Sequence, residues 1–386
     1  MKVLECGHAA VVGSLRVCEH MLVEEGPDYY RVLTGSGVRY DVACIECVEK
    51  PLLTVCEGCV DRVEDWGENL GWKGTPEVRH EDRFVAGTVR AEPCDVRPIN
   101  DRCLVLVRDG WLALTGHGLT GSDGTRYDVP LVLPGEGRPS PALHASDDGR
   151  YAAVVHDRGE RAVVLDLRSG EVVLRLDRGG YHVDQTPYPL AFLPGDRVVA
   201  ATCWNRLDVF ALPSGELLTG REPEGRLFEG GLLLSPGGRW LFADRWAWSP
   251  AGVPEVVDLD AWAREGGEPG GERLAQRWYA WDQPVAWVSD DVVAVQRLGE
   301  DDESMIDGVA LYEMPGGRQV GAFAGPSGRM WGRAGRLHVV GTGGLEVWDP
   351  ARGARVGVVE GFRPIAHRDG TFAAFGDGVL DIFSVD

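Results

Sequence analysis

From about residue 82 onward, short apolar runs alternate with turn residues along the chain. The runs are rich in Val, Leu, Ala and Trp, and clusters of Gly, Pro and Asp separate them. Short apolar runs bounded by turn residues are typical of β-strands, and the helical period of roughly 3.6 residues is nearly absent. The pattern therefore predicts an almost all-β domain, with one short helix in DLDAWAREGG from Asp258.

Two kinds of turn recur along this domain. One kind precedes an apolar strand, as in ASDDGRYAAV from Ala145 and HRDGTFAAF from His367. The other follows a strand, as in VLDLRSGEVV from Val164 and VWDPARGARV from Val347. Asp, Ser or Pro before Gly supplies a left-handed backbone position, so each kind predicts a tight hairpin. Like turns lie roughly 35 to 50 residues apart, a period at which four strands make one propeller blade.

This repeat resembles the WD-repeat and quinoprotein-like β-propeller superfamily over about 300 residues, with a Trp-Asp dipeptide at Trp348 and Asp349. The resemblance concerns the architecture and does not single out one family within it. Counting the repeats gives six blades followed by three further strands, with the blades at 93–137, 138–182, 183–225, 226–281, 282–326 and 327–361.

The three strands at the end of the chain need a fourth strand to complete a blade. An open ring would leave two exposed sheet edges, which proteins avoid. The stretch DRFVAGTVRAE, Asp82 to Glu92, is strand-like and has no blade of its own. We therefore predict a seven-bladed β-propeller in which this stretch becomes the outermost strand of the C-terminal blade.

The first 59 residues hold six of the nine cysteines, arranged with two histidines in close pairs. Each pair lies twelve residues from a pair of the same kind, and the four are Cys6 with His8, Cys18 with His20, Cys44 with Cys47, and Cys56 with Cys59. A pair separated by one or two residues can aim two ligands at one tetrahedral ion, and two pairs complete a closed site. Eight ligands predict two structural zinc ions, although the spacing does not say which pair joins which.

Free cysteines and a redox CxxC motif are the alternatives to metal binding. A redox pair needs a helix N-terminus within a βαβ unit, and no such helical pattern follows either CxxC. The order of the pairs resembles zinc-ribbon or treble-clef modules. A RING finger is less similar, because 23 residues with a hairpin-like stretch separate His20 from Cys44, and no ligase function is carried over. We predict a zinc-binding module at 1–80 and the propeller at 81–386.

The charge balance limits the partners. With 39 Lys and Arg against 60 Asp and Glu, the net charge of -21 repels nucleic acid and anionic membrane surfaces. Residues 1–80 are acidic as well, with 8 basic against 14 acidic side chains. The sequence has no apolar run long enough for a membrane-spanning helix, and Met1 to Ala10 has no secretory signal, so the expected location is cytoplasmic.

Seven of the 13 tryptophans lie between residues 240 and 287, six of them in the fourth blade. Such a concentration can form an aromatic surface that binds a protein partner, and the alternative is core packing. The candidate partner-binding residues are Trp246, Trp248, Trp262, Trp278 and Trp281.

Two functions from different classes follow from the sequence. The first is a non-enzymatic scaffold for protein–protein interaction, because the predicted metal sites are closed and no nucleophile motif is present. The second is a propeller hydrolase or lyase with His, Asp and Arg side chains in the central channel; a channel lined only by Ala, Gly and Val would dismiss it. The candidate histidines are His144, His156, His182 and His367. Nothing in the sequence indicates the oligomeric state.

Overall fold

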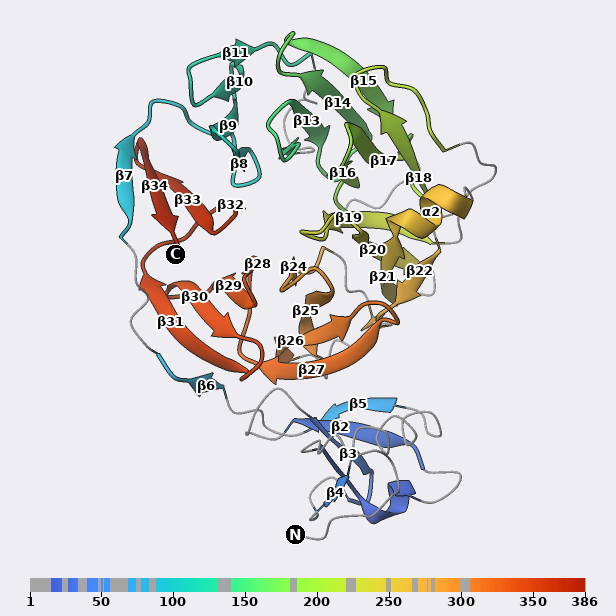
Figure 1. The fold of residues 1–386 in the computed structure, drawn as a ribbon. Coiled ribbons are helices and arrows are strands. Elements are labelled where there is room, and N and C mark those ends of the chain that lie inside the picture. The colour runs from blue at the N-terminus through green and yellow to red at the C-terminus, as the bar shows by residue number, and fades with distance from the viewer. Residues whose placement is uncertain are drawn as a thin grey trace.

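The computed structural model describes most of the chain. The described residues are 15–22, 27–33, 40–47, 50, 52–55, 69–73, 78–82, 88–130, 140–180, 186–219, 227–247, 251–265, 270–275, 277–278, 282–298 and 306–385. They form two parts, a large ring of sheets and a small module with a sheet of its own (Figure 1).

Seven sheets make up the ring within the described residues. The first two contain β8 (Leu104–Val107), β9 (Gly110–Thr115), β10 (Gly118–Gly121) and β11 (Arg126–Tyr127), then β12 (Pro141–Ala145), β13 (Tyr151–His156), β14 (Arg161–Asp166) and β15 (Glu171–Asp177). The next two contain β16 (Leu190–Leu193), β17 (Arg197–Cys203) and β18 (Arg206–Ala211), then β19 (Phe228–Leu234), β20 (Trp240–Ala247), β21 (Ala251–Asp258), β22 (Gly271–Arg273) and β23 (Arg277–Trp278).

The last three sheets complete the circle. They contain β24 (Val285–Trp287), β25 (Val292–Leu298), β26 (Ile306–Glu313) and β27 (Arg318–Ala324), then β28 (Met330–Arg333), β29 (Arg336–Val340), β30 (Gly344–Asp349) and β31 (Ala354–Glu360), and finally β32 (Ala366–Arg368), β33 (Thr371–Gly376) and β34 (Val379–Ser384). The predicted all-β propeller architecture is confirmed, and each of the six predicted blade ranges contains strands of one of these sheets.

The ring is closed by a strand that precedes the first ring sheet in the sequence. Strand β7 (Arg90–Pro93) pairs antiparallel with β34 and becomes the outer strand of the last sheet. It overlaps the predicted closing stretch at its C-terminal end. An additional strand, β6 (Arg79–His80), pairs in parallel with β31 of the preceding sheet, and two residues are too few for a sequence pattern to reveal it. Before it enters the first sheet, the chain therefore adds one strand to the outer edge of each of the last two sheets.

Ion pairs fix this entering segment to the ring. Arg355 contacts Asp82 at 2.7 Å, and Arg352 contacts Glu81. Arg355 is on β31 and Arg352 is in the turn before it, whereas Glu81 and Asp82 directly follow β6. The ion pairs therefore join residues that are far apart in the sequence. Backbone pairing and charge together hold the segment along the outer edge of its sheet.

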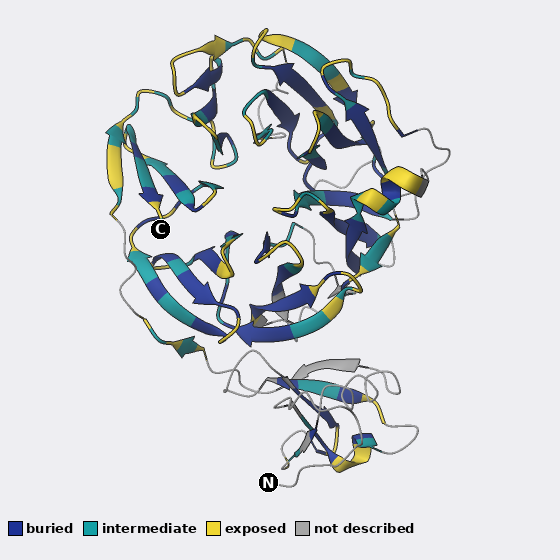
Figure 2. Ribbon diagram, viewed as in Figure 1, coloured by how far each residue is buried: buried dark blue, intermediate teal, exposed yellow. Residues whose placement is uncertain are grey.

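The core of the ring lies between neighbouring sheets, where strand residues are buried on both faces (Figure 2). All six residues of β13 are buried, because both faces of its sheet are covered. A separate apolar cluster occupies each contact between successive sheets, and one of them, around Leu104, Ala373 and Leu380, joins the last sheet to the first. Burial is thus shared around the circle and is not concentrated in one core.

The predicted turn chemistry is present at the hairpins. Gly149 in the first kind of turn has φ +69°, and Gly170 in the second kind has φ +74°. A side chain at these left-handed positions would be strained, which explains why glycine recurs there. The predicted helix is α2 (Leu259–Glu265), where the Asp258 carboxylate accepts hydrogen bonds from the backbone N–H groups of Asp260 and Ala261.

The small module has a sheet with the strand order β4-β1-β3-β2-β5. Its elements are β1 (Leu15–Val17), the 3-10 helix η1 (Glu19–Leu22), β2 (Tyr29–Leu33), β3 (Tyr40–Cys44), β4 (Leu53–Val55) and β5 (Asn69–Lys73). Strands β2 and β3 form the hairpin expected between His20 and Cys44. The sheet lies within 1–80, although β6 already pairs with the ring, so the division at residue 80 stays a prediction.

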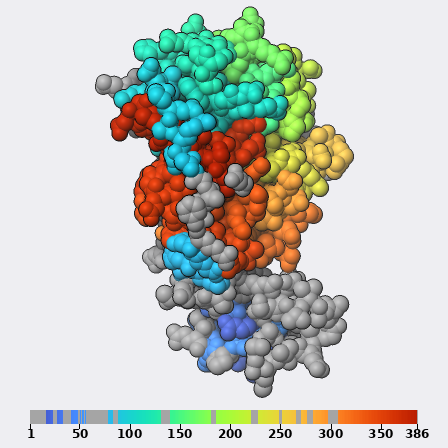
Figure 3. Space-filling view, turned by 60° about the vertical axis from the view of Figure 1, so that its left-hand side comes forward, coloured from blue at the N-terminus to red at the C-terminus, as the bar shows by residue number. Residues whose placement is uncertain are grey.

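The module lies against the ring, below it in Figure 3. One buried cluster includes Val17 and Val42 of the module together with Trp287 and Tyr312 of the ring. Arg31 of β2 donates a hydrogen bond to the side-chain oxygen of Gln319 on β27 at 2.7 Å. Apolar and polar contacts therefore both connect the two parts.

Candidate metal centre and central channel

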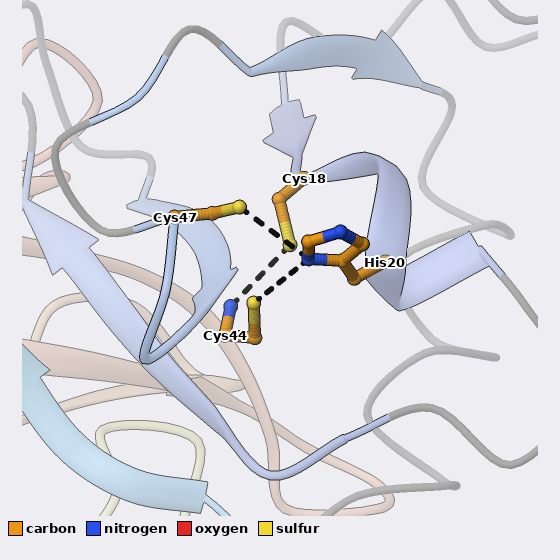
Figure 4. Close-up of side chains that lie close together, drawn as sticks. All are labelled: Cys18, His20, Cys44 and Cys47. Atoms are coloured by element: carbon orange, nitrogen blue, oxygen red, sulfur yellow. Dashed lines mark hydrogen bonds between the residues drawn. The ribbon is translucent and has the colours of Figure 1, made fainter.

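Four of the eight predicted metal ligands meet at one edge of the module sheet (Figure 4). Cys18 directly follows β1, and Cys44 is the last residue of β3. Because β1 and β3 run parallel, with Val17 opposite Val42, both chains leave the sheet at the same edge. His20 comes from η1 and Cys47 from the turn after β3, so the second CxH pair joins the first CxxC pair.

The four donor atoms lie within 4.8 Å of one another, and they can hold a metal ion. The His20 Nδ1 atom is 3.3 Å from the Cys44 sulfur and 3.5 Å from the Cys47 sulfur. In a tetrahedral site with typical metal–sulfur and metal–nitrogen bonds, neighbouring N and S atoms are roughly 3.5 Å apart. The three sulfurs and one nitrogen therefore fit a closed tetrahedral site.

The thiols of this group differ in acidity. Burial raises the pKa of Cys18, and burial with the neighbouring thiols raises the pKa of Cys47 to about 11. Burial alone would raise the pKa of Cys44 as well, but hydrogen bonds, foremost that of His20, bring it below its ordinary value. Three thiolates this close together repel one another, and a bound cation removes that repulsion.

Neighbouring groups hold the ligands in place. The backbone N–H of Cys44 donates to the Cys18 sulfur at 3.4 Å, and the N–H of Cys47 donates to the Cys44 carbonyl at 2.9 Å. Arg16 on β1 forms an ion pair with the buried Asp41 on β3 at 2.5 Å. This pair joins the two strands that carry Cys18 and Cys44, just before those residues.

The other four predicted ligands, Cys6, His8, Cys56 and Cys59, lie outside the described residues. Strand β4 ends at Val55, opposite Leu15 at the start of β1. The strand ends nearest in sequence to these ligands, Leu15 and Val55, therefore lie at the sheet edge opposite the donor set of Cys18, His20, Cys44 and Cys47.

The candidate partner-binding tryptophans do not form an exposed surface where the structure describes them. Trp246 on β20 is 2% exposed and stacks on Phe228 with ring centroids 4.4 Å apart, and Trp262 on α2 is 6% exposed. Both belong to the interior, as the core-packing alternative expected, because each fills space between neighbouring sheets. Trp248, Trp281 and the side chain of Trp278 lie outside the described residues.

A cavity of about 770 Å³ occupies the centre of the ring. It is lined by the first strand of every ring sheet, namely β8, β12, β16, β19, β24, β28 and β32. The channel is not lined only by small apolar residues. Its charged and histidine side chains are Asp101, Arg102, His144, Asp147, Asp282, Arg329, His367 and Arg368.

Charged groups from several sheets meet at one mouth of the channel, where the first strands begin. Arg102, before β8, contacts Asp157 at 2.7 Å and Asp282 at 3.6 Å. Arg158 contacts the same Asp282 carboxylate at 3.0 Å. Asp282 precedes β24 of the fifth sheet, whereas the two arginines belong to the first and second sheets. These ion pairs therefore reach across the ring.

Histidines and a further ion pair lie deeper in the channel and at its other end. Burial, with Arg102 nearby, lowers the pKa of His144 to about 4. Burial, with His338 nearby, lowers the pKa of His367 to about 4. Arg368 at the end of β32 contacts Asp147, which follows β12, at 2.9 Å. Two of the four candidate histidines therefore share the channel.

Of the other two candidate histidines, only His156 is among the described residues, and it does not line the cavity. His156 is buried in β13, and His182 lies outside the described residues. The sequence analysis missed Arg102, Asp282 and Arg329, which are scattered in the sequence. Their shared position just before a first strand is the signal that could have pointed to them.

Comparisons with known proteins support the fold and leave the function open. No family model matches the sequence, and no curated protein matches it. Among solved structures, the Neurospora crassa Pan2 WD40 domain is similar with a TM-score of 0.54 and 12% identity, over 79% of this chain and 97% of that chain. Kuenenia stuttgartiensis hydrazine synthase has a TM-score of 0.51 and 14% identity, over 76% of this chain and 98% of that chain.

The third similar structure is virginiamycin B lyase from Staphylococcus aureus, with a TM-score of 0.51 and 11% identity, over 78% of this chain and 100% of that chain. At such low identities, these likenesses show the fold alone. The resemblance to WD-repeat and quinoprotein-like propellers is thereby confirmed for the architecture. None of the described helices is long and apolar enough to cross a membrane.

Proposed function

We propose that this chain is a non-enzymatic scaffold for protein–protein interaction, in which an N-terminal module stabilised by zinc is attached to an acidic propeller. The observation that carries the proposal is the closed donor set of Cys18, His20, Cys44 and Cys47. Four protein ligands leave no open coordination position for a substrate, as in structural zinc sites. The propeller offers a large rigid surface, a common basis of binding function in this fold.

The proposal includes two zinc ions. The first is held by the donor set of Cys18, His20, Cys44 and Cys47. The second would use Cys6, His8, Cys56 and Cys59, because this set repeats the same residue types at a spacing of twelve residues. The pairing of β1 with β4 supports it, since the chain segments that lead to both pairs start from one sheet edge.

The partner is a protein with a basic contact surface. The net charge of -21 favours encounter with positive surfaces and disfavours nucleic acid and anionic membranes. A reducing compartment, the cytoplasm, keeps the cysteine ligands available for the metal.

The scaffold is tested by capture of partners from a native lysate of the source organism in zinc-containing buffer. We expect a stoichiometric partner that wild-type protein retains and that elutes as the salt concentration rises, because exposed charge contacts are screened. A matched capture with the Cys44→Ser variant shows whether the module contributes to the contact. Recovery of no stoichiometric partner by the wild-type protein would overturn the scaffold function.

A hydrolase or lyase with a channel site is the second candidate. The observation in its favour is the convergence of His144, His367, Arg368 and Asp147 on one cavity. With a pKa of about 4, both imidazoles are neutral and weakly basic near pH 7, so each has a ring nitrogen that can accept a hydrogen bond from a substrate and orient it. Turnover of chromogenic ester or lactone substrates that disappears in both His144→Gln and His367→Gln would support it. Activity that survives both substitutions would contradict the channel site.

A further inference from the structure

Arg329 has an unusual position among the arginines of the channel. It directly precedes β28 and lines the central cavity. Its Nη1 group donates to the backbone carbonyls of Ile365 at 3.2 Å and Asp101 at 3.4 Å. Among the described residues, no carboxylate forms an ion pair with Arg329, whereas Arg102, Arg158 and Arg368 each have one. Arg329 therefore brings a positive charge to the cavity without an ion-pair partner in the part of the chain that the structure describes.

The two carbonyl contacts aim the Arg329 guanidinium. Asp101 precedes the first ring sheet, and Ile365 precedes the last, so the Nη1 contacts hold the group between three neighbouring sheets. A guanidinium has five N–H donors, and the contacts with carbonyls use the Nη1 group alone. Among the described residues, its other nitrogens have no hydrogen-bond partner and are not buried, so they are accessible at the cavity that Arg329 lines.

The charge around Arg329 leaves room for an anion. Three arginines, Arg102, Arg158 and Arg329, surround the mouth. The carboxylates of Asp157 and Asp282 form ion pairs with the first two, and the third carboxylate at this mouth, that of Asp101, is on an exposed residue. Burial lowers the pKa of Arg329, and the proximity of Arg102 lowers it further, while Asp101 and Asp282 counteract this. Two neighbouring guanidinium groups repel each other, and an oxyanion between them would remove that repulsion.

A cation would fit this mouth less well. The Asp157 and Asp282 carboxylates form ion pairs with arginines, so a metal ion or ammonium group would have to displace those arginines or bind to the exposed Asp101 alone. An anion can use the donors of Arg329 without breaking an existing ion pair.

We propose that this mouth of the channel binds the oxyanion group of a small molecule, a carboxylate or a phosphate, with Arg329 as the principal donor and Arg102 as the second. Guanidinium groups bind both anions through paired hydrogen bonds. A cavity of about 770 Å³ accommodates a metabolite of ordinary size behind the anionic group. This site is separate from the metal centre and does not require that the chain is a scaffold.

Calorimetric titration of the full chain with inorganic phosphate, succinate and citrate tests the site. We expect saturable binding of one equivalent of at least one of these anions, weaker at higher salt. Arg329→Gln should weaken the affinity at least tenfold, and Arg329→Lys should keep part of it. The matched control is Arg161→Gln, because Arg161 forms an exposed ion pair with Asp177 on the second sheet and should leave binding unchanged.

A second measurement guards against a variant that fails to fold. Ligand that binds the folded state raises the midpoint of thermal unfolding, and the wild-type protein should show this rise with the same anions. Binding of phosphate alone or of the carboxylates alone supports the site and identifies the source of the oxyanion. The inference is overturned if none of the three anions binds to the wild-type protein, or if Arg329→Gln binds them as tightly.

Discussion

The strands of the ring reach eight residues in β20 and β21, whereas those of the module are three to five residues long. In the ring, buried strands stack against a neighbour on each face, and apolar clusters occur at every contact between successive sheets. In the module, one small sheet carries a Cys and His cluster at its edge. The two parts therefore achieve stability differently. The ring distributes burial over many contacts, and the module has a small core beside a donor set that can hold a metal ion.

This difference predicts where each part is vulnerable. A closed ring loses most when its closure is broken, because every sheet then loses the support of its neighbour in turn. A small domain with few buried residues loses most when its metal is removed, because the binding free energy of the metal is part of its folding free energy. The following changes separate these two modes, beginning with the largest expected effect.

Deletion of residues 377–386 should have the largest effect, because it removes β34 and with it the partner of β7. Leu380 and Phe383 on β34 are almost completely buried. Loss of two such side chains costs more than about 5 kcal/mol, which is comparable with the whole stability of a domain. Thermal unfolding followed by circular dichroism should show loss of the cooperative ring transition. Removal of residues 1–4 is the control, and an equal effect of the two deletions would contradict the closure.

Metal removal should unfold the module and leave the ring folded. Purified protein should contain two equivalents of zinc, and Cys44→Ser should lose one of them, because it removes a sulfur of the closed donor set. The expected loss for the module is on the order of several kcal/mol, and limited proteolysis should then cut within residues 1–80 first. Cys203→Ser, at a half-buried cysteine on β17 of the ring, is the matched control. Wild-type protein without metal would overturn the zinc assignment.

The same comparison explains what the sequence could reveal. The turns at Gly149 and Gly170, the strands between them and the closing strand were predictable, because turn chemistry and strand periodicity are local signals. The ligand types were predictable for the same reason. Which CxH pair joins which CxxC pair was not, because the choice depends on the parallel pairing of β1 and β3, a long-range contact.

The channel site shows the limit of local signals more clearly. Arg102, Asp282 and Arg329 are far apart in the sequence, and only the closed ring brings them to one mouth. Burial of Trp246 also depends on the facing sheet, since nothing in its local sequence distinguishes a packed tryptophan from an exposed one. A search for sequence motifs therefore does not find residues that only ring closure brings together.

A smaller effect than the loss of a closing strand is expected from a buried charge within one ring sheet. Arg245 on β20 contacts Glu229 at 3.0 Å and Glu255 at 2.6 Å, and all three side chains are buried. Arg245→Met leaves two carboxylates buried without their cation, which should cost about 3 to 5 kcal/mol in chemical denaturation. The control Arg318→Met removes an exposed ion pair with Glu313 and should change stability little. Equal stability of the two variants would show that the buried network contributes nothing.

The smallest effect should come from protonation of buried histidines in the ring. His338 on β29 is 1% exposed and packs 4.9 Å from the Phe372 ring, and burial lowers its pKa to about 4. The unfolded chain has a histidine pKa of about 6.5, so it binds more protons than the folded ring between these values. Stability is therefore complete above pH 6.5 and falls as the pH decreases toward 4.

One such histidine accounts for about 3 kcal/mol over this interval. His338→Leu should reduce the acid-dependent loss of stability, measured by urea unfolding at pH 7 and pH 4.5, by roughly a third, because His144 and His367 also have a pKa of about 4. The exposed His117, replaced by Gln, is the control and should leave the difference unchanged. If His338→Leu shows the same difference in stability between pH 7 and pH 4.5 as the wild-type protein, the acid sensitivity originates outside the contact between His338 and Phe372.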